Sequence, residues 1–161
     1  MPHTNNVICA TICAYVVFER SVLLVHHDKL NRWLPMGGHI EPGEDPDMAL
    51  FRELEEETGM LRHEVRAFNQ PQPSPVEPGG KTLLVPQYMD RHVIDPACSL
   101  DHFALIYFLR ARTNGVQLEV GAHREIRWFT EEDLDAPKYE LSDRVKFYAK
   151  SAIKQANAVD R

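Results

Sequence analysis

The stretch GHIEPGEDPDMALFRELEEETGM, residues 38–60, constrains this chain of 161 residues more than any other part of it. It predicts a glycine-containing loop that leads into a helix rich in carboxylates. At 3.6 residues per turn, Glu53, Glu56 and Glu57 fall within roughly 100° of one another around the helix axis. Such a cluster is typical either of a solvated helix face, the commoner case for three glutamates alone, or of the oxygen ligands of a hard cation such as Mg2+.

The ends of the predicted helix have ordinary sequence signals. Asp45 followed by Pro46 is typical of a helix start, because the first side chain can cap the helix and proline fits its first turn. Gly59 is typical of a left-handed helix end. Arg52 lies one turn before Glu56, so it can pair with that carboxylate and orient it, or form an ordinary helix ion pair.

The same stretch matches, position for position, the pattern G-x5-E-x7-R-E-U-x-E-E-x-G-U, in which U is a large apolar residue. The matching residues are Gly38, Glu44, Arg52, Glu53, Leu54, Glu56, Glu57, Gly59 and Met60. A chance match at one start position has a probability on the order of 10⁻⁹ from average residue usage. The pattern resembles the box of the Nudix hydrolases, or MutT-like pyrophosphatases. The resemblance implies an α/β fold, an α/β/α sandwich with a mixed curved sheet, formed as a single domain by residues 1–161.

The resemblance also implies an activity. We expect an enzyme acting on phosphorus-containing acid anhydrides, which hydrolyses a pyrophosphate bond in a nucleoside triphosphate, ADP-ribose or similar compound by attack of water on phosphorus. Glu53, Glu56, Glu57 and a backbone carbonyl at Gly37 would hold Mg2+, for which Mn2+ could substitute. The cation would neutralise the diphosphate and lower the pKa of bound water.

Other residues have expected roles in that reaction. Glu53 would take the proton of the attacking water, or an additional acid, Glu119 or Glu125, would do so. Glu44 and Arg52 would act mainly by positioning.

Three residues are candidate substrate contacts. Gly38, with its neighbouring glycine, lets the backbone approach a ligand closely. Arg32 could touch a phosphate or only water. Trp33 could stack on a base, although a tryptophan beside an apolar strand more often anchors the core.

Two alternative functions remain open from the sequence. Some Nudix-like domains sense nucleotides without hydrolysing them, but their boxes are usually damaged, whereas this one is intact. A prenyl diphosphate isomerase of the related family relies on a cysteine and a glutamate, and the one loop cysteine here is Cys98. The two other cysteines, Cys9 and Cys13, have no metal-site spacing and are expected to be buried free thiols.

Charge and hydropathy limit the partners. The net charge of −6, the pI near 5.7 and the absence of a Lys/Arg run argue against a nucleic acid polymer and favour a small nucleotide or diphosphate substrate. No apolar run reaches 18 residues and no basic leader is present, so we expect a soluble, cytoplasmic protein without a membrane contact. A homodimer formed through an edge strand stays open.

The rest of the chain predicts the other elements of the sandwich. Apolar runs predict strands over 7–18, 21–27, 63–68, 81–94, 102–111 and 125–129, and spaced apolar residues predict a final helix over 141–159. The proline-rich segment 69–80 predicts an extended loop, either a substrate-binding lid or a surface excursion.

Overall fold

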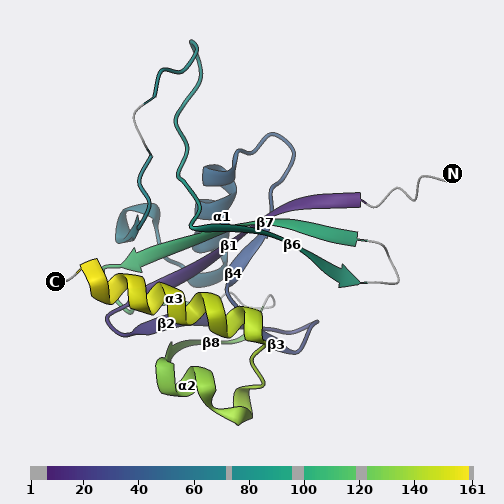
Figure 1. Ribbon diagram of the computed structural model, residues 1–161, viewed down its shortest axis with the longest axis vertical. Helices are drawn as coiled ribbons and strands as arrows, with labels where there is room; N and C mark the ends of the chain where they lie inside the picture. The colour runs from purple at the N-terminus through teal and green to yellow at the C-terminus, as the bar shows by residue number, and fades with distance from the viewer. Residues whose placement is uncertain (1–6, 72–73, 96–99, 119–122, 160–161) are drawn as a thin grey trace, which may run out of the picture.

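The computed structural model describes residues 7–71, 74–95, 100–118 and 123–159. Its centre is an eight-stranded sheet with the order β3–β2–β1–β7–β5, in which β4 also pairs with β1, β6 with β7 and β8 with β2 (Figure 1). The strands are β1 (Val7–Phe18), β2 (Ser21–His27), β3 (Arg32–Leu34), β4 (Met36–His39), β5 (Val65–Ala67), β6 (Tyr88–Asp95), β7 (Leu100–Ala111) and β8 (His123–Thr130).

The sheet is mixed because its central seam is parallel and its other pairings are antiparallel. β1 runs parallel to β7 from the pair Val7–Leu100 to the pair Val17–Arg110. β2 and β4 pair with β1 in antiparallel register, and β5 and β6 pair with β7 in the same way. The apolar run over 102–111 therefore lies in β7, a strand with neighbours on both sides.

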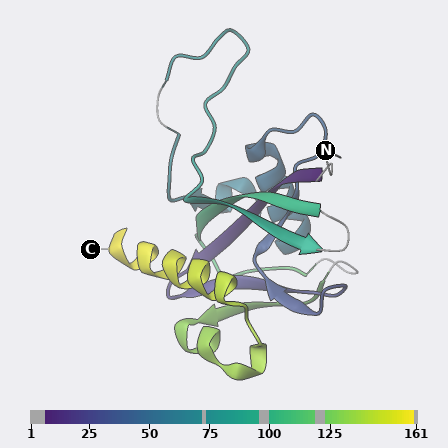
Figure 2. The same ribbon diagram turned by 45° about the vertical axis from the view of Figure 1, so that its right-hand side comes forward.

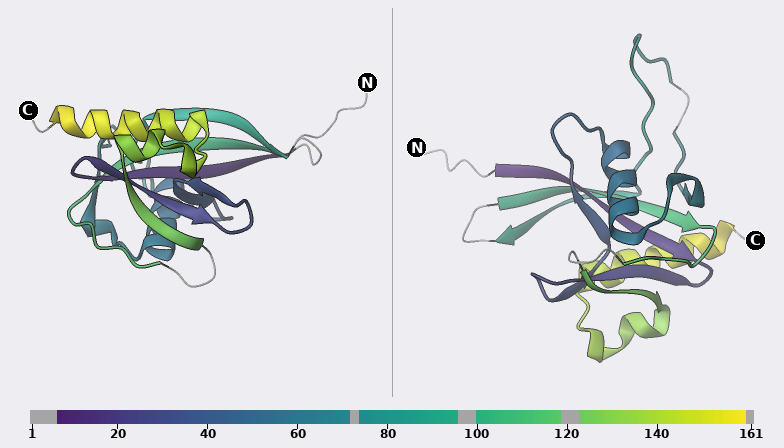
Figure 3. Two further views of the ribbon diagram at one scale, coloured as in Figure 1. Left: turned by 90° about the horizontal axis from the view of Figure 1, so that it is seen from below. Right: turned by 180° about the vertical axis from the view of Figure 1, so that it is seen from behind.

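Helices cover both faces of this sheet. The 13-residue α1 (Pro46–Thr58) lies on one face and the 17-residue α3 (Asp143–Val159) lies on the other, as the view from below and the view from behind show (Figure 3). The short α2 (Glu131–Asp135) follows β8, and 3-10 turns occupy Arg62–Glu64 and Pro137–Tyr139. The expected α/β/α sandwich is confirmed.

The alternation of side chains along β1 divides the core in two. Tyr15 and Val17 belong to the apolar cluster under α3. Ile12, Ala14 and Val16 belong to the cluster under α1. Because successive side chains of a strand point to opposite faces, one apolar strand anchors both helices.

The ends of α1 agree with the sequence signals. The Asp45 side chain accepts a hydrogen bond from the Met48 N–H at 3.0 Å, and Pro46 opens the helix. Gly59 has φ 70° and donates its N–H to the Glu55 carbonyl at 2.9 Å. The helix that displays the carboxylates is therefore capped at both ends by its own sequence.

Two strands are shorter than the sequence predicts. The strand expected over 63–68 is only Val65–Ala67, because residues 62–64 form a 3-10 turn. The strand expected over 81–94 begins only at Tyr88. The preceding residues lie beside α1 instead: the Leu84 N–H donates to Asp47 at 3.1 Å, and Lys81 binds Asp45 at 2.7 Å. Between residue 74 and these contacts the chain extends away from the body (Figure 2).

None of the helices in the described residues is both long enough and apolar enough to cross a membrane. Cys98, the candidate isomerase cysteine, lies outside the described residues.

Candidate active site

The backbone of β4 passes directly beneath the carboxylate of Glu53. A Cβ added to Gly38 would lie 2.2 Å from Glu53 Oε1 and 2.7 Å from Glu53 Cδ. Only glycine leaves room for this approach. Because Gly38 has no side chain, the Glu53 carboxylate of α1 can lie against the backbone of β4.

Glu57 is held from two sides. The Gly37 N–H donates to Glu57 Oε2 at 2.9 Å, and His123 Nε2 lies 2.7 Å from Glu57 Oε1. His123 begins β8, and its side chain is 3% exposed. Sequence reasoning did not give His123 a role, because it lies 66 residues from its partner and no local pattern links them.

Arg52 joins the loop, the helix and β4. Its guanidinium binds both oxygens of Glu44, with Nε at 2.7 Å and an amino nitrogen at 3.0 Å. The same side chain reaches Glu53 at 2.8 Å, Glu56 at 3.1 Å and the His39 carbonyl at 3.1 Å. A planar guanidinium with five N–H donors suits such shared recognition. Arg52 is therefore a common counter-ion for three acids of the box.

The electrostatics of this cluster suit a divalent cation. Burial raises the pKa of Glu53, and the negative charges of Glu57 and Glu56 raise it further, against the lowering effect of Arg52. Arg52 instead lowers the pKa of Glu44. Mg2+ prefers oxygen ligands, and a divalent cation would relieve the repulsion between these carboxylates. The described residues contain no three acidic, histidine or cysteine side chains already arranged around a metal position. The carboxylates would have to turn from Arg52, Gly37 and His123 to share one ion.

The remaining candidates that the structure describes take no part in the hydrogen bonds of this cluster. Trp33 is 8% exposed and packs against Phe129 at 4.8 Å between ring centroids, so its ring is part of the core. Arg32 is exposed at the start of β3. Glu125 is exposed in β8 opposite His26. Glu119 lies outside the described residues.

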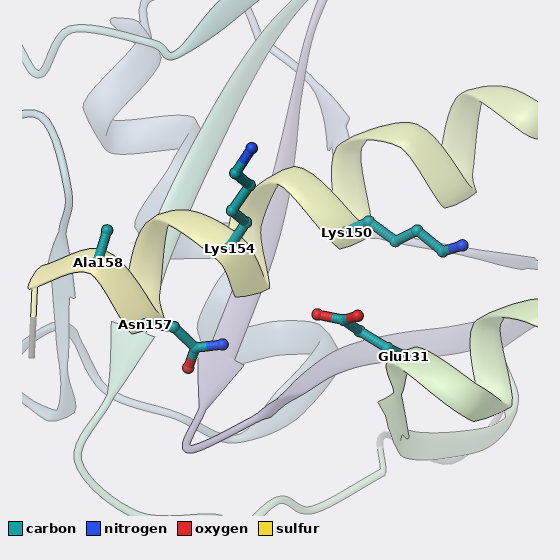
Figure 4. A pocket seen from close by; sticks show the side chains of 5 residues that line it. All are labelled: Glu131, Lys150, Lys154, Asn157 and Ala158. Carbon is teal, nitrogen blue, oxygen red and sulfur yellow. The ribbon is translucent and has the colours of Figure 1, made fainter.

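A hollow between α2 and α3 lies apart from these residues. Glu131 of α2 and Lys150, Lys154, Asn157 and Ala158 of α3 line it (Figure 4). Lys150 already binds Asp135 at 2.6 Å. No residue expected at the site is among those that line this hollow.

Comparisons with known proteins bear on the fold of the whole chain. The model of the NUDIX domain matches residues 8–150. A NUDIX family hydrolase from Clostridium perfringens is similar in structure, with 26% sequence identity and a TM-score of 0.74 over 90% of this chain and 95% of that chain. A MutT NUDIX hydrolase from Burkholderia pseudomallei has 21% identity and a TM-score of 0.63, over 92% and 98% of the two chains.

A third similar structure carries a ligand. The NUDIX domain of Shewanella oneidensis NrtR, complexed with ADP ribose, has 16% identity and a TM-score of 0.62 over 100% of this chain and 94% of that chain. A comparison with curated proteins found no match.

Proposed function

Because this chain belongs to the NUDIX family, we propose that it hydrolyses a pyrophosphate bond in a nucleoside diphosphate derivative, with Mg2+ as the cofactor and Mn2+ as a substitute. The observation that carries the proposal is the position of the three box glutamates. Glu53 lies over Gly38, Glu57 is bound to Gly37, and Arg52 links Glu53 and Glu56. An intact box with this geometry favours hydrolysis over nucleotide sensing or isomerisation.

The cation would be held by Glu53, Glu56, Glu57 and the backbone carbonyl of Gly37. When bound there, it would supply charge neutralisation for the diphosphate and a more acidic water. Until a cation binds, His123 holds Glu57 through the 2.7 Å contact to Oε1, because a buried carboxylate needs a partner to keep its position.

Glu53 is the best-placed proton acceptor. Burial raises the pKa of Glu53 and the charges of Glu57 and Glu56 raise it further, against Arg52, so a Glu53 carboxylate that is not itself bound to the cation would be a stronger base than an exposed glutamate. Until a cation binds, Arg52 holds Glu53 through the 2.8 Å hydrogen bond. Glu125 is the second candidate, but it is exposed and its register partner is His26.

A small nucleotide is the favoured substrate class. The similar Shewanella oneidensis domain is complexed with ADP ribose, which contains the pyrophosphate bond that the proposed reaction would cleave. The net charge of −6 also agrees with a small substrate whose phosphates meet a cation, rather than with a nucleic acid polymer.

Initial rates on a nucleotide panel test the proposal. The purified protein would be incubated with Mg2+ and nucleoside triphosphates, ADP-ribose, dinucleoside polyphosphates and nucleotide sugars. We expect cleavage of at least one compound, and loss of at least about a hundredfold of kcat/KM in Glu56→Gln and in Glu57→Gln, because each change removes a charge at nearly constant volume.

Glu55→Gln is the matched control. Glu55 lies in the same helix and is exposed, so the same chemical change there should leave the rate near that of the wild type. A fully active double variant of Glu56 and Glu57 would refute the cation site. Absence of cleavage across the panel, with nucleotide binding retained, would favour a sensing module.

A further inference from the structure

The strand β6 has a partner along only one of its edges within the described residues. It pairs with β7 in antiparallel register, from the pair Tyr88–Ile106 to the pair Val93–Asp101, and the register shifts between Val93 and Asp95. No other described strand pairs with it. Along its outer edge, which borders the sheet beside β7 (Figure 1), backbone N–H and C=O groups remain available to a further strand.

The charged side chains in the middle of β6 do not guard this edge. The strand contains no proline and no lysine, the residues that commonly protect an exposed edge. Asp90 accepts hydrogen bonds from Arg144 Nε at 2.9 Å and from the Tyr148 hydroxyl at 2.8 Å. Arg91 Nε donates to Asp101 at 2.7 Å. Because each charge is already paired within its own chain, neither repels an approaching strand as strongly as an isolated charge would.

Exposed apolar side chains flank β6 on both faces of the sheet. Met89 and Val93 share the face of Phe103, their neighbour in β7, and α1 covers the same face further along β7. Tyr88 lies on the opposite face, where its ring centroid is 5.8 Å from that of Phe147 in α3. These side chains are between 39% and 63% exposed. Apolar surface gathered on both sides of an unpaired edge is typical of an interaction site.

The area of this surface fits a reversible contact between two copies. Side chains of this size have roughly 200 Å2 of surface each, so together they expose about 500 Å2 in one copy and about 1,000 Å2 in two. Specific interfaces bury about 1,200–2,000 Å2 in total, and the edge backbone and the half-exposed Arg91 side chain supply further area. Contacts at the lower end of this range are usually weak, so we expect a dissociation constant on the order of 10 μM.

We propose that β6 pairs in antiparallel register with β6 of a second copy of this chain, about a two-fold axis at Arg91, so that the two sheets join into one. The second strand supplies the backbone groups that the outer edge of β6 lacks. Both copies use the same edge, so the contact closes on itself and stops at two chains. The inference goes beyond the proposed function and does not depend on it, because none of these residues belongs to the carboxylate cluster.

The side chains of β6 are complementary to one another in this register. Met89 lies opposite Val93 of the second copy, so an apolar side chain meets an apolar side chain. Asp90 lies opposite His92 of the second copy, which places an acceptor across from an imidazole. The two Arg91 side chains face each other, but each is neutralised by the acid that it binds in its own β7. A shift of the register by two residues in either direction would instead place Met89 opposite a charged residue.

Sedimentation equilibrium of the whole protein tests self-association directly. The measurements would run from about 2 to about 200 μM, which brackets the expected dissociation constant. We expect the mean mass to rise with concentration from near 18.5 kDa towards twice that value. Met89→Lys and Val93→Lys each place a charge opposite an apolar side chain, so each should raise the dissociation constant at least about tenfold. The melting temperature should stay near that of the wild type, because both side chains are exposed.

Two matched controls make the same chemical changes away from β6. Met48→Lys changes α1, Val76→Lys changes the segment 74–80, and both wild-type side chains are about half exposed. Both control variants should keep the wild-type dissociation constant. If the two β6 variants lose the dimer only together with their folded state, Phe147→Glu on α3 repeats the test from outside the strand, with the same expected rise in the dissociation constant.

Disulfide cross-linking tests the register. Met89→Cys and Val93→Cys proteins mixed in equal amounts should form a linked dimer under mild oxidation, because opposite residues of antiparallel strands lie within disulfide reach. Either variant alone should form far less, since its two introduced cysteines would lie about 13 Å apart along the strands. The wild type under the same oxidation controls for the native cysteines.

Several results would overturn the inference. One is a mean mass that stays at 18.5 kDa up to the highest concentration. Others are a folded β6 variant with the wild-type dissociation constant, an equal loss of the dimer in the controls, or a cross-link that either cysteine variant forms as readily alone. Masses above twice 18.5 kDa would indicate open-ended association and would refute the closed two-fold pair.

Discussion

Gly38→Ala would separate the position of Glu53 from the stability of the fold. The new Cβ would lie 2.2 Å from Glu53 Oε1, whereas ordinary contacts begin near 3.4 Å. The carboxylate is the end of a flexible side chain, so it would retreat by roughly 1 Å while β4 keeps its place. A misplacement of about 1 Å can lower a rate about a hundredfold. We expect that loss in kcat/KM, with a change in the free energy of unfolding below about 1 kcal/mol.

The assay pairs initial rates with urea unfolding, and Gly37→Ala provides the contrast. A Cβ at Gly37 would lie 2.2 Å from the Ile12 carbonyl oxygen, and φ is +148° there, so the clash is with backbone and the conformation itself is strained. Gly37→Ala should therefore lose stability as well as activity. A Gly38→Ala protein with wild-type kcat/KM would refute the reasoning, because displacement of Glu53 would then have no catalytic consequence.

Two further predictions concern the packing of the core and the dependence of the free energy of unfolding on pH in acid. Trp33→Ala should cost about 3–5 kcal/mol of unfolding free energy and leave KM unchanged, since the ring packs against Phe129; a raised KM with unchanged stability would instead indicate stacking on substrate. Burial alone would raise the pKa of Asp90, but hydrogen bonds from Arg144, His92 and Tyr148 lower it to about 2. Its contribution, on the order of 1–2 kcal/mol after allowance for partial exposure, is present above about pH 4 and lost as the pH falls towards 2. Asp90→Asn should make the free energy of unfolding, measured in urea, depend less on pH between pH 2 and 6. An unchanged pH dependence would contradict the assignment.

Local signals predicted α1 well because its ends depend on neighbouring residues. Asp45, Pro46 and Gly59 each act within one turn of the helix, so their effects can be predicted from the sequence. The predicted start of β6 was wrong because it depends on residues far away in the sequence. Residues 81–87 are apolar enough for a strand, but contacts from Asp47 and Asp45 of the α1 start hold them beside that helix.

The candidate site also contains some contacts that the sequence predicts and others that it does not. The spacing of the glutamates in α1 and the close approach of Gly38 follow from residues within one short stretch. The His123–Glu57 contact joins residues 66 positions apart, so only the strand order of the sheet brings them together. No periodicity in the sequence encodes that pairing.

The parallel seam of the sheet has a consequence for how the protein is made. Val7 pairs with Leu100 and Val17 with Arg110. Each residue of β1 can therefore pair with β7 only after a residue 93 positions later has been synthesised. At about 5–20 residues per second, that wait lasts roughly 5–20 s on the ribosome. During this interval β1 can pair with β2 and β4 along one edge, while the other edge presents unsatisfied backbone groups and apolar side chains. Nascent chains that end before residue 100 are for this reason the form of the protein most exposed to aggregation and most in need of a chaperone.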